Sequence, residues 1–157
     1  MIGSREFNRF LRLWREGKSF WVSPAPGSSS SYLIAAAIRA ASSPFIAIYP
    51  DEKAAGIARE EIGDLSGTEV EFYPALDIVP GGGGLPDPDL GAERNRILFL
   101  LMRAPDRIPF LLTTTSAAVQ PVPVPENIGD EYRGLKTGDR IDLIELIRWL
   151  VEKGYRN

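Results

Sequence analysis

The chain has 157 residues, a length that fits one domain with a sizeable core, and 44% of its residues are hydrophobic. Its 18 Lys and Arg residues are outnumbered by 21 Asp and Glu residues, and the pI near 5.1 argues against a protein that coats nucleic acid by bulk charge. The absence of Cys and His excludes disulfides, zinc sites built on those ligands, and any Cys or His nucleophile or base.

The N-terminal segment does not have the pattern of a targeting or membrane segment. It carries Arg5, Glu6 and Arg9 among apolar residues, which is typical of an amphipathic helix and not of a signal peptide. No apolar run in the chain approaches the ~20 residues that a membrane-spanning helix needs. We therefore expect a cytoplasmic protein without a membrane partner.

Hydrophobic periodicity predicts helices and strands in alternation. In chain order we expect helix 4–18, strand 19–23, helix 32–41, strand 44–49, helix 52–65, strand 68–73, helix 91–103, strand 108–113, a helical turn at 116–120 and helix 142–153. Residues 74–91 form a long loop, 121–125 an extended proline-rich segment, and 131–140 can hold a short hairpin strand. This order predicts an α/β fold, one domain over residues 1–157, with a parallel sheet and helices on both faces.

The first turn between a predicted strand and a helix is the candidate site, because ligands of parallel sheets bind at the carboxyl ends of strands. The turn reads SPAPGSSSS over residues 23–31. A phosphate-binding loop has the pattern G-x-x-x-x-G-K-[ST]. Aligned on its end, the segment Gly27, Ser28, Ser29, Ser30 and Ser31 places Ser30 at the lysine position, while Ser31 matches the metal-binding hydroxyl.

The missing lysine decides what this turn can do. That side chain supplies the charge on the β- and γ-phosphates, which serine cannot supply. We therefore expect a degenerate phosphate loop in a chain with no catalytic residue, no metal ligand and no cofactor of its own. Backbone N–H groups at the helix start still allow weak anion binding. The turn by itself favours a simpler interpretation, in which the serines only cap the following helix.

Two acidic segments also invite a metal hypothesis. Asp51 and Glu52 follow an apolar strand, but they also begin a helix, and we interpret them as an N-cap and a first-turn charge. Asp77, Asp87 and Asp89 lie in the long loop without the spacing of a calcium site, and four consecutive glycines between them indicate a solvated loop, with a flexible lid or a partner contact as the alternative.

Basic and aromatic side chains could indicate nucleic-acid binding. Arg94 and Arg96, which follow Glu93, do not alternate with aromatic residues as single-strand binders require, so we interpret them as a solvated helix face. Trp14, Trp21 and Trp149 each fall within an apolar pattern, which favours core packing over stacking on a cofactor or base.

The order of several segments resembles a known family. The segments are IAIYPDEKAAGIARE (46–60), EVEFYPALDIVP (69–80), GAERNRILFLLM (91–102), PFLLTTTSAAVQPVPVP (109–125) and LKTGDRIDLIELIRWLVEKGYRN (135–157). The most distinctive is the strand with its short AL.Q..P-like turn and extended segment. Together they resemble, over about residues 7–157, the N-terminal region of the bacterial transcription-repair coupling factors (Mfd), which is itself similar to the first domain of UvrB.

The resemblance implies a helicase-like fold of the P-loop NTPase type, as in domain 1a of UvrB. UvrB works with ATP through an intact phosphate loop, whereas the coupling-factor region keeps the fold and has lost the loop lysine, as Ser30 indicates here. Residues 50–60 take the place of a helicase motif that touches nucleic acid in active enzymes. The family's chains continue past this region into an inserted UvrA-binding domain, so this chain is expected to be an N-terminal fragment of a longer multidomain protein.

The resemblance also implies a role. The parent factor displaces stalled RNA polymerase with ATP and Mg²⁺, moves on DNA and recruits UvrA in transcription-coupled nucleotide excision repair. This region would be a non-catalytic scaffold that contacts other domains of the same factor, with UvrA, RNA polymerase and DNA as partners only through the parent. Two alternatives remain: a nucleotide- or anion-binding doubly wound domain that retains weak ATP or DNA binding, and a stand-alone protein unrelated to repair.

Overall fold

A computed structural model describes residues 5–23, 26–41, 44–77, 87–122 and 133–153 of the chain. These residues fall into two compact units, Met1–Pro121 and Val122–Asn157. The first unit contains the sheet and both hydrophobic clusters, and the second contains the last helix.

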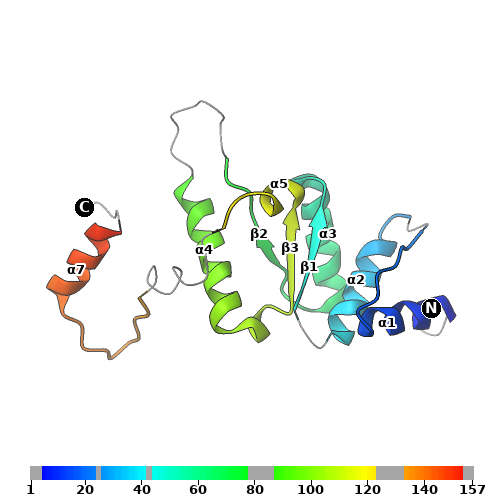
Figure 1. Ribbon diagram of the computed structural model, residues 1–157, viewed down its shortest axis with the longest axis horizontal. Coiled ribbons are helices and arrows are strands. Elements are labelled where there is room, and N and C mark those ends of the chain that lie inside the picture. The colour runs from blue at the N-terminus through cyan, green and yellow to red at the C-terminus, as the bar shows by residue number, and fades with distance from the viewer. Residues whose placement is uncertain (1–4, 24–25, 42–43, 78–86, 123–132, 154–157) are drawn as a thin grey trace. The chain divides into compact units, whose positions relative to one another are not determined.

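The first unit is built on a three-stranded parallel sheet, with β1 (Phe45–Tyr49), β2 (Glu71–Tyr73) and β3 (Phe110–Thr114) (Figure 1). The strand order is β1-β3-β2, so the last strand in sequence is central. Phe45 pairs with Phe110, and Glu71 pairs with Leu111. All five residues of β3 are buried, as expected for a strand covered on both faces. The predicted α/β class and the strands at 44–49, 68–73 and 108–113 are confirmed.

Helices connect the strands. Those of the first unit are α1 (Arg5–Arg15), α2 (Ser29–Ala40), α3 (Glu52–Ser66), α4 (Pro88–Arg103), α5 (Thr115–Ala118) and the 3₁₀ turn η1 (Pro105–Arg107). Asp51 caps α3 as predicted, because its side chain accepts from the Ala54 N–H at 2.8 Å. The helix ends at Gly67, whose φ of 69° is left-handed and whose N–H donates to the Gly63 carbonyl.

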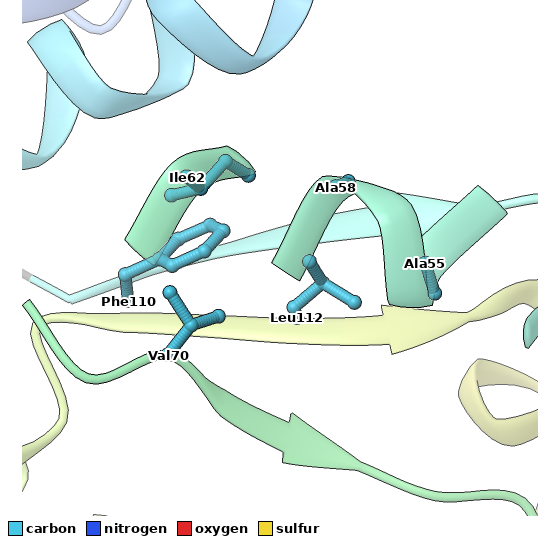
Figure 2. Close-up of a cluster of buried hydrophobic side chains, with 6 residues drawn as sticks. All are labelled: Ala55, Ala58, Ile62, Val70, Phe110 and Leu112. Atoms are coloured by element: carbon cyan, nitrogen blue, oxygen red, sulfur yellow. The ribbon is translucent and has the colours of Figure 1, made fainter. Parts of the chain in front are cut away.

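Alternate residues of β3 contribute to two different hydrophobic clusters. Phe110 and Leu112 pack with Ala55, Ala58 and Ile62 of α3 and with Val70 (Figure 2). Leu111 belongs to a second cluster with Ile97 of α4, Tyr73, Ile108 and Ala117. Because successive side chains of a strand point to opposite faces, α3 and α4 cover opposite faces of the central strand.

The predicted strand at 19–23 is wrong. Residues 18–23 have no regular secondary structure, and the indole of Trp21 is 99% exposed. Phe20 packs edge-on against Phe10 of α1, with ring centroids 5.6 Å apart. A short apolar run becomes a strand only when a neighbouring strand accepts its hydrogen bonds, and here its anchoring side chain is held by a helix instead.

Two predicted boundaries also change. The helix expected from residue 32 begins at Ser29, and the helix expected from residue 91 begins at Pro88. Proline at the first positions of α4 suits a helix start, and Asp87 caps it by accepting from the Asp89 N–H at 2.9 Å. The last residues of the proposed loop, 88–91, therefore belong to the first turn of a helix.

The second unit contains α7 (Leu143–Glu152), which confirms the helix predicted near the chain end. Asp142 caps it by accepting from the N–H groups of Ile144 and Glu145 at 2.9 and 3.1 Å. Residues 133–140 hold no strand, so the proposed hairpin is absent from this stretch. Within the described ranges, none of the helices combines the length and apolarity needed to cross a membrane.

Candidate functional site

The candidate loop lies at the start of α2. Gly27 has a φ of 56°, a left-handed conformation that glycine adopts without steric cost. The Ser28 carbonyl accepts the first helical bond from the Tyr32 N–H at 3.0 Å. The Ser28 side chain makes no capping hydrogen bond, so the interpretation of this serine as a side-chain cap is wrong.

The serine hydroxyls are instead bound by a carboxylate from α3. Ser28 Oγ donates to Glu61 Oε1 at 2.6 Å, and Ser31 Oγ donates to Glu61 Oε2 at 2.6 Å. Ser31 is buried, with 3% of its surface exposed. Hydrogen bonds from Ser28 and then from Ser31 lower the pKa of Glu61, because both stabilise the ionised form. The loop residues thus hold an anion that belongs to the chain itself.

This arrangement does not fit a nucleoside triphosphate with its magnesium ion. Ser30 is half-buried and uncharged where the pattern requires a lysine. The Ser31 hydroxyl, which would bind the metal ion, instead donates a hydrogen bond to Glu61. The carboxylate also places negative charge beside any phosphate that approached the two hydroxyls. Moreover, the preceding residues 18–23 are not a strand, so the loop does not follow a strand of the sheet.

Tyr49 lies near the same carboxylate. Burial, and secondarily the charge of Glu61, raise the pKa of the Tyr49 hydroxyl. Its oxygen is buried and has no hydrogen-bond partner among the described residues. Both effects favour the neutral, protonated form of the Tyr49 phenol.

Three consecutive threonines tie the carboxyl ends of the strands together. Thr113 Oγ1 donates to the Tyr73 carbonyl of β2 at 2.8 Å, and Thr115 Oγ1 donates to the Tyr49 carbonyl of β1 at 3.1 Å. Thr114 between them is fully buried and caps α5 by accepting from the Ala117 N–H at 3.3 Å. At the carboxyl end of the sheet, where ligands usually bind, two of these hydroxyls join strands and the third caps α5.

A buried arginine makes a second link between distant segments. Arg94 of α4 is 4% exposed, and its Nη1 donates to the Pro74 carbonyl at 2.8 Å and to Gln120 Oε1 at 2.9 Å. Its Nη2 donates to the Pro121 carbonyl at 3.3 Å, and the guanidinium lies 4.3 Å from the centre of the Tyr73 ring. The interpretation of this residue as part of a solvated helix face is wrong.

Gln120 completes the link. Its Oε1 accepts from the Leu76 N–H at 2.8 Å, and its Nε2 donates to the Leu76 carbonyl at 2.9 Å. The Gln120 amide thus pairs with both backbone groups of Leu76, as a neighbouring strand would, and it also accepts a hydrogen bond from Arg94. The segments after β2 and after β3 are held side by side by this pair.

One of these residues could have been found from the sequence. Arg94 stands three, four and seven positions before Ile97, Leu98 and Leu101, which places it on the apolar face of its own helix. Glu61 carries no comparable signal, because its serine partners lie 30 and 33 positions away.

The remaining candidates are distributed as follows. Asp51 is a helix cap, and Arg96 is exposed and paired with Glu71 and Glu93. Residues 78–86, including the four glycines, lie outside the described residues, so neither the solvated-loop nor the lid interpretation is tested. In the described ranges, no three acidic side chains come together in a way that could hold a metal ion.

The tryptophans have two different environments. Trp14 packs as predicted, with its ring edge-on to Phe45 at 4.7 Å. Trp149 is half-buried on α7. Trp21 contradicts the prediction of core packing, because its indole is almost completely exposed.

No protein-family model matches the chain, and no curated protein matches it.

Proposed function

We propose that this chain is the non-catalytic, UvrB-like scaffold domain of a bacterial transcription-repair coupling factor. In this proposal the fold is a P-loop NTPase fold whose phosphate loop no longer binds a nucleotide. The observation that carries it is Glu61, whose carboxylate binds the Ser28 and Ser31 hydroxyls of that loop. A carboxylate in this place opposes phosphate binding by charge and removes the hydroxyl that a metal ion would need.

The contacts between distant segments support a scaffold. The threonines 113–115, Arg94 and Gln120 all lie in the segments on which the resemblance rests. Their side chains make hydrogen bonds to backbone carbonyls, to a helix cap and to one another, and these bonds join the ends of the strands. Joined strand ends suit a domain that positions its neighbours and carries out no chemistry.

The wider role follows from the proposed family. The parent factor would use ATP and Mg²⁺ in its motor, act on DNA and stalled RNA polymerase, and recruit UvrA. This chain would contribute none of the motor chemistry. It would contact other domains of the same factor and hold the UvrA-binding part in position.

Nucleotide binding tests the proposal. A ligand that binds the native state raises the melting temperature. We expect no rise when ATP and magnesium are added to the chain, as measured by differential scanning fluorimetry with ADP and with magnesium alone as controls. A concentration-dependent rise would overturn the proposal in favour of a domain that retains nucleotide binding.

Replacing the loop serine by lysine gives a second test. Ser30→Lys restores the pattern of a phosphate loop, but the Glu61 carboxylate remains on Ser28 and Ser31. We expect no ATP hydrolysis above the level of the unchanged chain in a phosphate-release assay. Turnover by this single variant would show that the rest of the motor is present.

A further inference from the structure

An aromatic cavity lies between α1, residues 20–23 and the start of α2. Its volume is about 890 Å³, within the range of cavities that bind ligands or apolar side chains. Five aromatic side chains line it, namely Phe7, Phe10, Phe20, Trp21 and Tyr32. Phe7 contacts Tyr32 with ring centroids 6.0 Å apart, and this contact joins the two helices that form its walls.

Trp21 is the unusual member of this lining. Its side chain is 99% exposed although it borders the cavity, and the adjacent Val22 is 46% exposed. A tryptophan left in water next to an apolar cavity is typical of a residue that anchors a binding partner. It contributes nothing to the packing of the two hydrophobic clusters.

The helix beside the cavity is basic in an acidic chain. Four exposed arginines lie on α1: Arg5, Arg9, Arg12 and Arg15. None of them has a carboxylate within ion-pair distance among the described residues. Arg5, Arg9 and Arg12 follow one another at spacings of four and three, so they form a stripe along one side of the helix, and Arg9 also lines the cavity.

We propose that this cavity and arginine stripe bind an acidic amphipathic helix of a partner protein. Apolar side chains of that helix enter the aromatic cavity and stack against Trp21. Its acidic residues, spaced at three and four positions, pair with the stripe on α1. Both features are needed, because the cavity supplies affinity and the charges supply orientation.

The same surface suits nucleic acid less well. A single strand needs a positive groove that follows its backbone, with aromatic side chains spaced along it. Here the aromatic side chains converge on one cavity, Glu6 stands in its wall, and the chain as a whole has a net charge of -3. Ser28 and Ser29 of the serine loop border the cavity, but the proposal rests on the aromatic side chains and on the arginines of α1, and so it does not depend on the function proposed above.

Fluorescence anisotropy with defined peptides tests it on the full chain. The probe is a labelled helical peptide whose leucines follow one another at alternating spacings of three and four positions, with glutamates at the other positions. A peptide of the same composition in scrambled order, a peptide with lysines in place of the glutamates, and labelled oligothymidylate are the comparisons. We expect binding of the acidic helix, weakening with added salt, and markedly weaker binding of the other three.

Two variants and two controls locate the site. Trp21→Ser and Arg9→Glu should each weaken binding of the acidic peptide by about tenfold or more. Val119→Ser changes another exposed apolar residue, and Arg107→Glu reverses another exposed arginine, so both should bind like the unchanged chain. Because all four side chains are exposed, circular dichroism should show the same fold in every variant.

Three outcomes would overturn the proposal. One is no binding of the acidic peptide by the unchanged chain. Another is equal binding of the lysine peptide, which would remove the role of the arginine stripe. The third is tighter binding of oligothymidylate that is lost in Trp21→Ser and Arg9→Glu, which would assign the surface to nucleic acid.

Discussion

Glu61 shows how one side chain can change the chemistry of a loop. It binds two hydroxyls from the start of α2, both at 2.6 Å. The bonds stabilise the ionised carboxylate and lower its pKa. A group whose pKa is lower in the folded state stabilises the fold at pH values above its unfolded pKa, and this contribution is lost as the pH falls through the folded pKa.

We therefore predict a pH-dependent effect of Glu61→Gln. The variant should melt at a lower temperature than the unchanged chain near neutral pH, and the difference should shrink as the pH falls below about 4.3, the ordinary glutamate value. Melting curves recorded across this pH range provide the measurement. Glu60→Gln, at the exposed neighbouring position, is the control and should show no such pH-dependent difference. A Glu61→Gln difference that is constant with pH would contradict the role of the ionised carboxylate.

Arg94 and Arg96 give a matched pair on one helix. Arg94 is buried and its guanidinium serves three acceptors, whereas Arg96 is exposed and pairs with Glu71 and Glu93. Arg94→Lys should lower the free energy of unfolding by about 1–3 kcal/mol, because an ammonium cannot reach all three acceptors. Arg96→Lys should cost less than about 1 kcal/mol, as surface pairs usually do. Chemical denaturation of both variants tests this, and equal losses would contradict it.

At the level of elements, the strand order explains why the strands differ in how much of their surface is buried. β3 lies between β1 and β2 and is buried throughout. β1 lies at the edge, and its alternate residues Ile46 and Ile48 are each 59% exposed. The apolar sequence of β1 is therefore no guide to its burial, because position in the sheet decides how much of each face is covered.

Central and edge strands should respond differently to the same kind of truncation. Leu112→Ala in β3 should cost about 2–5 kcal/mol, since it opens a cavity in the cluster with α3 (Figure 2). Ile48→Ala in β1 should cost about 1 kcal/mol or less, because most of its side chain is already in water. Urea unfolding, fitted with the same m-value for both variants, would measure the two losses in the free energy of unfolding. A loss at Ile48 as large as that at Leu112 would mean that this face of β1 is covered in solution.

At the scale of the whole molecule, both hydrophobic clusters belong to the first unit. Their members lie between Ile34 and Ala117, and the unit boundary falls at Pro121. The links made by Arg94 and Gln120 also end at Pro121. The described members of both clusters and both links therefore lie within residues 1–121.

This division predicts that residues 1–121 fold without residues 122–157. The shortened chain should unfold cooperatively, and its melting temperature should fall by only a few degrees, because no cluster residue is removed. Circular dichroism melts of both lengths measure this. A shortened chain without a cooperative transition would show that the second unit is required for the core.

The sequence by itself determined the α/β class, three of the strands and the capping role of Asp51, because these depend on local periodicity and capping residues. It also determined the absence of the loop lysine. Residue spacing on α4 contained enough information to predict that Arg94 is buried.

Only the tertiary structure decided what the serines of residues 28–31 bind and whether residues 19–23 join the sheet. Glu61 meets Ser28 and Ser31 across 30 or more positions, through the packing of α3 against α2. Residues 19–23 have a strand-like composition, but Phe20 is held by α1. Local patterns encode how a segment can fold, whereas its neighbours in space decide which of its groups are satisfied, and no sequence period records those neighbours.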